Sequence, residues 1–266
     1  MSEPAETVVT TEMRLQALMD FLNHHVLNAR EWHIVPGLTL HIEWSWFSLH
    51  AIMLVLAAGF LIYLFGFRYD RHQKVPSGLS NLLETFVLFI RDKICIACLG
   101  EEDGKRMAPL FLSFFFFILT LNLMGLIPFF ASATANVSVT GGLAAISLFF
   151  MTFGAIYKNG FVGFFQAFVP HGVPWPVLIL LVPIEMLGVL IKCFALMIRL
   201  FANMLAGHMV LGAIIGLIVV FGLIALPAAA LGVAVYILKI GVSLLQAYIF
   251  TMLSAMFMGQ IWHPAH

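Results

Sequence analysis

Long apolar stretches separated by short polar segments make up most of the chain after residue 43. A helix that crosses a membrane perpendicularly needs about twenty apolar residues, so we expect an all-α polytopic membrane protein. Five spans are predicted, at residues 44–67, 107–130, 139–157, 177–226 and 228–260. The fourth stretch is much longer than one perpendicular span requires. Its helix is therefore expected to be tilted, broken or partly in the membrane plane.

The polar segments complete the predicted organisation. Residues 1–40 are expected to form an outward-facing segment with a short amphipathic helix at 12–26, and residues 41–260 to form a single membrane domain. Residues 77–98 mix apolar and charged positions, a pattern typical of an interfacial amphipathic helix or a hairpin. The remaining polar or mixed segments are predicted as a loop at 101–106, a connector at 158–176 and a turn at 225–227.

Composition supports a membrane protein and excludes several functions. The chain is 62% hydrophobic and 10% charged, with a formal net charge of zero, so it lacks the basic footprint of a nucleic-acid-binding protein. Cys95 and Cys98 form one C-x-x-C without a second pair, whereas zinc sites use four ligands. The histidines of the amino-terminal segment have no metal-site spacing: His24, His25, His33 and His41. We therefore expect no metal and no cofactor.

One apolar stretch, residues 184–210, carries five polar or ionisable side chains: Glu185, Lys192, Arg199, Asn203 and His208. The first four recur at intervals of seven, seven and four residues, which places them on a helical stripe about 60° wide. His208 falls on the opposite face. Ionisable groups at membrane depth are costly and usually functional. A direct ion pair between Glu185 and Arg199 is the structural alternative, but their backbones would lie about 21 Å apart.

The motifs around this stretch carry a family resemblance. RLFANMLAGH at 199–208, the glutamate fourteen residues before its arginine, and LQAYIF at 245–250 closely resemble subunit a of the rotary F-type ATP synthase. LNLMGLIP at 121–128 and TAN at 134–136 fit the same family, and the resemblance covers roughly residues 40–258.

The resemblance implies an architecture and a set of partners. It implies two long, tilted antiparallel helices at the carboxyl-terminal end, which face a ring of small carboxylate-bearing subunits, the c-ring. The other implied partners are the peripheral-stalk subunit b, the bilayer and, indirectly, the F1 ATPase sector. The chain would then be the stator subunit of a rotary motor, not an enzyme on its own, and would couple hydrogen ion transport to ATP synthesis.

The polar residues divide into two sets around Arg199. Glu185 belongs to the set expected towards the inside. The set expected towards the outside consists of Glu43, His208, Lys239 and Gln246. Arginine keeps its charge when desolvated, so Arg199 would separate two proton half-channels. A ring carboxylate that passes Arg199 would be stabilised in its ionised form by the nearby cation.

Two positions depart from the family pattern. Lys239 stands seven residues before the glutamine of LQAYIF, where His or Glu is common in the family, and Gly125 replaces an acidic residue of some relatives. A lysine relays protons only if its neutral form is accessible near neutral pH. The alternative is that Lys239 is a structural cation.

Orientation and function are predicted from charge and from repeats. Eight of the thirteen basic residues fall in loops assigned to one side, so the positive-inside rule places the amino terminus outside and the carboxyl terminus inside. The acidic start lacks the basic region of a cleavable signal, which favours a bacterial cell inner membrane over a mitochondrial one. A stand-alone ion transporter or channel is the alternative function, but no internal repeat is evident.

Overall fold

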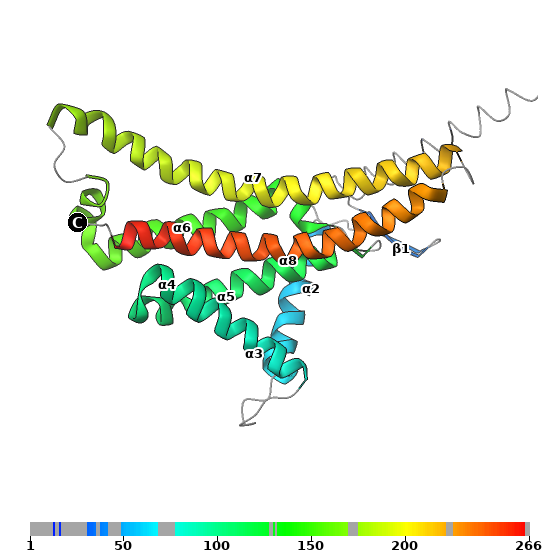
Figure 1. The fold of residues 1–266 in the computed structure, drawn as a ribbon, viewed down its shortest axis with the longest axis horizontal. Coiled ribbons are helices and arrows are strands. Elements are labelled where there is room, and N and C mark those ends of the chain that lie inside the picture. Colours follow the sequence, from blue (N-terminus) through cyan, green and yellow to red (C-terminus); the bar gives the residue numbers. More distant parts are fainter. Residues whose placement is uncertain are drawn as a thin grey trace, which may run out of the picture. The chain divides into compact units, whose positions relative to one another are not determined.

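The computed structural model describes Met13, Gln16 and residues 31–35, 38–41, 49–68, 78–127, 130, 132–169, 175–221 and 226–263. Five helices within these residues are long and apolar enough to cross a membrane. This number agrees with the five predicted spans. The chain is an all-α polytopic membrane protein, apart from one short hairpin near its amino-terminal end (Figure 1).

The helical elements follow one another with short breaks. They are α2 (Leu49–Tyr63), η1 (Leu64–Arg68), α3 (Leu79–Phe89), η2 (Ile90–Cys95), α4 (Ile96–Leu99), α5 (Glu101–Met124), η3 (Ala133–Ala135), α6 (Val137–Gln166), α7 (Trp175–Phe221) and α8 (Leu226–Trp262). The elements α3, η2 and α4 adjoin one another, which agrees with a helix over residues 77–98. The fourth predicted span is α7, a helix of 47 residues that includes Pro183.

The prediction of a loop at 101–106 is wrong, and the connector at 158–176 is helical in its first part. Residues 101–106 form the first turns of α5, where the carboxylates of Glu101, Glu102 and Asp103 complement the positive end of the helix dipole. Gly100, with φ of 82°, separates this helix from α4. The first part of the 158–176 connector belongs to α6, which continues to Gln166 past a kink at Gly160 with φ of 73°.

A two-stranded antiparallel hairpin, β1 (Glu31–Val35) and β2 (Leu38–His41), was not predicted. Its pairs run from Glu31 with His41 to Val35 with Leu38. The sequence Pro36-Gly37 between the strands is a turn signal that could have indicated it. The helix predicted at 12–26 lies outside the described residues, except for Met13 and Gln16, which are both helical.

The chain divides into two compact units. Unit 1 consists of Met1–Ala57, Leu119–Val139 and Phe201–Leu245, and unit 2 consists of Ala58–Ile118, Thr140–Leu200 and Gln246–His266. Each of the long helices α7 and α8 contributes to both units. Each unit is described separately below.

Unit 1 is held together around the connection between α5 and α6. The Tyr236 hydroxyl in α8 donates a hydrogen bond to the carbonyl oxygen of Leu126, at 3.1 Å. A Cβ at Gly125 would lie 2.8 Å from the Ser132 hydroxyl and 2.9 Å from the terminal methyl of Met204 in α7. Ser132 and Met204 therefore occupy the space that a side chain at position 125 would need. The acidic residue of some relatives cannot be placed here without repacking.

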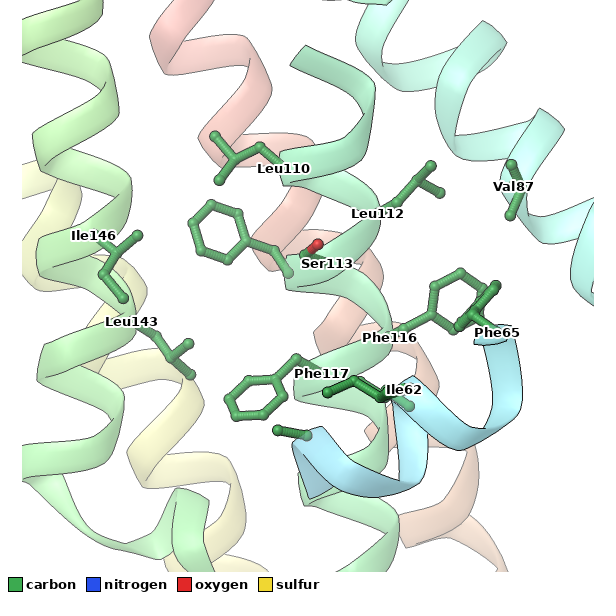
Figure 2. Close-up of a pocket in the computed structure, with 13 residues that line it drawn as sticks. Ile62, Phe65, Val87, Leu110, Leu112, Ser113, Phe116, Phe117, Leu143 and Ile146 are labelled. Carbon is green, nitrogen blue, oxygen red and sulfur yellow. The ribbon is translucent and has the colours of Figure 1, made fainter. Parts of the chain in front are cut away.

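Unit 2 packs aromatic and small residues at its interior. Phe114 of α5 contacts Phe250 of α8 with their ring centroids 5.7 Å apart. Trp262 lies against Gly154 of α6, where any Cβ would clash with the indole. An apolar groove of about 730 Å³ lies between α2, α3, α5 and α6 (Figure 2). Phe65 and Phe116 pack edge to face along it, with ring centroids 4.9 Å apart.

Candidate functional site

The charged stripe predicted on α7 is exposed at its two ends. Glu185 and Arg199 both lie in unit 2, and both side chains are exposed. Within the described part of the chain, neither has a hydrogen bond or an ion pair. Lys192, midway between them, donates a hydrogen bond to the side-chain oxygen of Gln260 in α8, at 2.8 Å. Its ammonium also lies 5.0 Å from the ring centroid of Phe257.

The three charges of this stripe therefore differ in what they can do. Lys192 is attached to α8 by two contacts, which is typical of a structural cation. Arg199 is exposed on a long apolar helix, and its guanidinium has no partner among the described residues. A guanidinium in an apolar environment stays charged and favours an anionic partner.

Unit 1 contains a small cavity between α7 and α8. It has a volume of about 290 Å³, and its polar lining residues are Asn203, Lys239 and Ser243. The structure thus brings together two of the residues predicted from the sequence, Asn203 and Lys239. At about 30 Å³ for each molecule in the liquid, a cavity of this size has room for several waters.

Lys239 fits into this cavity because the residue facing it on α7, Gly207, has no side chain. The Lys239 side chain is only 7% exposed. A Cβ at Gly207 would lie 2.5 Å from the Lys239 Cε and 3.0 Å from its Nζ, so the lysine occupies space left by the glycine. The Lys239 Nζ has no hydrogen-bonding partner among the described residues, and none of the lining residues is acidic. The Ser243 hydroxyl, which also lines the cavity, donates a hydrogen bond to the backbone oxygen of Lys239 at 2.8 Å.

The other described site residues belong to different units. His208 of α7 is partly buried in unit 1, and Gln246 of α8 is buried in unit 2. The Gln246 amide nitrogen has no hydrogen-bonding partner among the described residues. Glu43 lies outside the described residues.

Four buried polar residues of unit 1 were missed by sequence reasoning. They are His50 in α2, Asn122 in α5, and Ser132 and Thr134 in the connection to α6, each at most 1% exposed. Their side-chain polar atoms have no hydrogen-bonding partner within the described part of the chain. His50 could have been found, because it is an ionisable residue inside a predicted span. Asn122 and Thr134 stand inside the two shorter family motifs.

No group of three metal-ligating side chains occurs among the described residues. Cys95 is buried, and burial raises the pKa of its thiol to about 12. A thiolate ligand at Cys95 is therefore unfavourable near neutral pH.

Comparison with known proteins identifies the family. The sequence model described as ATP synthase A chain matches residues 48–259, which include α2 through α8 almost entirely. The chain belongs to the ATP synthase A chain family. The match includes both the exposed Arg199 and the cavity that contains Lys239.

Three bacterial relatives, each named ATP synthase subunit a, show the extent of the likeness. The protein of Anaeromyxobacter sp. strain Fw109-5 is 41% identical over 80% of this chain and 53% of its own length. The Myxococcus xanthus protein is 40% identical over 79% of this chain and 71% of its own length. The Chloroherpeton thalassium protein is 39% identical over 91% and 77%. This chain spans about half the length of the Anaeromyxobacter relatives it matches.

Proposed function

We propose that this chain is the stator subunit a of the membrane sector of a bacterial F-type ATP synthase. It would provide two proton half-channels and the cation that couples proton translocation to rotation of a c-ring. The observation that carries the proposal is Arg199, an exposed and unpaired arginine among the described residues, on α7 of a chain that belongs to this family.

The mechanism follows from the difference between a fixed charge and a titratable one. Arg199 keeps its proton, so it cannot pass protons along and instead blocks direct conduction between the half-channels. A ring carboxylate beside Arg199 is stabilised as the anion and releases its proton. When the carboxylate moves away from Arg199 into an apolar environment, its neutral form is favoured and it takes up a proton. Net transport then requires movement of the ring.

The proposed half-channels use the remaining polar residues. Glu185 would belong to the inward path, and His208, Lys239, Gln246 and Glu43 to the outward path. Asn203 would belong to the proton path without assignment to either half. The buried, unpartnered ammonium of Lys239 supports a proton relay over a structural ion pair, because no acidic residue lines its cavity. The peripheral-stalk subunit b and, indirectly, the F1 sector would complete the assembly. The amino terminus would lie outside the inner membrane and the carboxyl terminus inside.

The test compares two cations on the same face of α7. We expect Arg199→Ala to abolish ATP-driven proton pumping by inverted membrane vesicles while the subunit still co-isolates with the ring and the ATPase. Arg199→Lys should fail nearly as badly, since a desolvated lysine can lose its proton. Lys192→Ala is the matched control and should retain pumping, because Lys192 contacts Gln260 and Phe257 within the protein. Normal pumping by Arg199→Ala vesicles would contradict the proposal.

A further inference from the structure

His50 is an ionisable residue buried in the first spanning helix. It lies on the same face of α2 as the buried Met53 and Ala57, and its side chain is 1% exposed. Neither ring nitrogen has a hydrogen-bonding partner among the described residues. A buried polar group without a partner is destabilising. A buried imidazole of this kind therefore needs either a bound water or a functional reason.

His50 is one of several such groups in unit 1. Both polar atoms of the Asn122 amide and the hydroxyls of Ser132 and Thr134 are also buried and without partners among the described residues. These side chains come from α2, from the end of α5 and from the connection to α6, which belong to one compact unit. Protein interiors leave few buried polar groups unpaired, and clusters of such groups are commonly paired by ordered water.

One member of this polar set, Ser132, lies near a residue that lines the cavity containing Lys239. The Ser132 hydroxyl and the Met204 methyl both border the position that a Cβ at Gly125 would occupy. Met204 also lines the cavity, together with Asn203 and Lys239. Met204 is thus near both Ser132 and the Lys239 cavity. Because methionine is unbranched and flexible, its side chain can adapt to water on either side.

We propose that His50 is a titratable member of a hydrated path inside unit 1, which it shares with Asn122, Ser132 and Thr134. The inference rests on the proposed function, since the path would extend the outward half-channel. An imidazole accepts a proton on one nitrogen and releases one from the other, and therefore relays a proton while the imidazole itself stays in place. In the helices of unit 1, the other titratable side chains are His208, Tyr236 and Lys239. His50 would supply a titratable group where Gly125 provides none.

The first test measures passive proton conduction by vesicles from which the soluble ATPase sector has been stripped. We expect His50→Leu to lower the conduction rate about tenfold or more, as for loss of a proton-transfer group. His50→Gln keeps a polar side chain of similar size but cannot titrate. It should lower the rate and also remove one inflection from the dependence of the rate on outward-side pH. If the leucine variant fails to assemble, the glutamine variant decides.

A matched pair of serines controls for burial. Ser132 in unit 1 and Ser147 in unit 2 are each 1% exposed, and neither hydroxyl has a partner among the described residues. Ser132→Ala should slow conduction, whereas Ser147→Ala should not. Equal effects of the two substitutions would contradict a path confined to unit 1.

A second test measures hydration directly in a cysteine-free background. A cysteine that replaces His50 should react with a small, membrane-impermeant thiol reagent added from the outward side. A cysteine that replaces Ala57, on the same buried face of α2, should not react. Normal conduction by both His50→Leu and His50→Gln vesicles would overturn the proposal whatever the labelling result. If Arg199→Ala still blocks pumping in that case, the proposed function stands and only the role of His50 fails.

Discussion

Unit 2 contains a partly exposed cluster of paired charges, whereas unit 1 contains buried ionisable side chains. In unit 2 the charges of α5, α6 and the end of α8 meet one another. Lys158 pairs with Asp103, and the His263 ring lies 3.0 Å from the same carboxylate and 3.0 Å from the Lys158 ammonium. In unit 1 the Lys239 ammonium and the His50 imidazole are buried without partners among the described residues.

The difference concerns this charge cluster only, since Arg199 and Glu185, which we propose act in transport, also lie in unit 2. Paired charges favour one fixed arrangement of the helices that carry them, although a partly exposed pair adds little stability. Unpaired ionisable groups in a membrane protein favour water and proton exchange. Unit 2 also has buried unpaired groups, but these are the hydroxyls of Ser147 and Ser254 and the Gln246 amide. None of those three titrates near neutral pH.

The largest difference is expected when one cation is removed from each unit, Lys239 from unit 1 and Lys158 from unit 2. Lys239→Met should stop ATP-driven proton pumping, because methionine keeps the length of the side chain without a group that exchanges protons. Lys239→His and Lys239→Glu should largely retain pumping. Lys158→Met, which removes the paired cation of unit 2, should retain pumping. Pumping rates of inverted vesicles, normalised to the amount of assembled complex, provide the measurement.

The same series separates a proton relay from a structural cation at position 239. If Lys239 is structural, Lys239→Arg will be tolerated and Lys239→Glu will not. Full pumping by Lys239→Met vesicles would remove this residue from the path and leave Glu43, His50 and His208 as the outward titratable candidates.

A smaller effect is expected from filling the space beside Lys239. Gly207→Val places a side chain where the Lys239 Cε and Nζ now lie, and such overpacking typically costs about 1–3 kcal/mol. We expect the lysine head to be displaced and pumping to fall several-fold. Gly241→Val in the same unit is the matched control, since a Cβ there meets nothing within 4 Å. Equal pumping by the two valine variants would argue against a close Gly207–Lys239 contact.

Gly154 in unit 2 offers the corresponding test of packing without transport chemistry. Gly154→Val drives a side chain into the Trp262 indole and should lower the stability of the purified complex by about 1–3 kcal/mol. Gly142→Val, on the same helix, has open space and should be nearly neutral. Thermal unfolding in detergent would measure both. A larger loss from Gly142→Val would contradict the Gly154–Trp262 packing.

The smallest effect is expected at the ion pairs of unit 2. Asp103→Asn should cost about 1 kcal/mol or less, because the Asp103 and Lys158 side chains are 18% and 30% exposed. Asp92→Asn breaks the pair of Asp92 with Arg91, whose side chains are both more than 40% exposed, and should cause no measurable change. Comparison of the two unfolding curves checks this. Loss of pumping in Asp103→Asn would assign this ion pair a transport role that its pairing argues against.

The fold could be predicted from the sequence largely because the apolar stretches are long. Their lengths gave five spans and identified the excess length of α7. The start of α5 was missed because EEDGKR is a loop by composition, although its acids are stabilised at the amino-terminal end of a helix. The composition of the 158–176 connector does not indicate its conformation, and within α6 only Gly160 departs from helical geometry.

The candidate site could be predicted only along individual helices. Periodicity places Arg199 and Lys192 on one face, but it does not show that Lys192 contacts Gln260 in α8 while Arg199 remains exposed. The Gly207–Lys239 contact joins residues more than thirty positions apart, so no local pattern indicates it. His50 is a lone histidine in the first span, so no spacing of polar residues indicates that it faces the interior.

The last turn of α8 has a consequence for biosynthesis. The Trp262 indole donates to the carbonyl oxygen of Met151 at 3.4 Å, and the Asn159 amide reaches the Trp262 carbonyl oxygen at 3.3 Å. A ribosome makes α6 about a hundred residues before it makes this turn. During that interval Trp262 has not been made, so Gly154 lacks its packing partner and the Asn159 amide lacks its hydrogen-bond acceptor. Unit 2 can therefore close only after translation has reached Trp262, and until then its α6 surface is available to the cell's membrane chaperones and proteases.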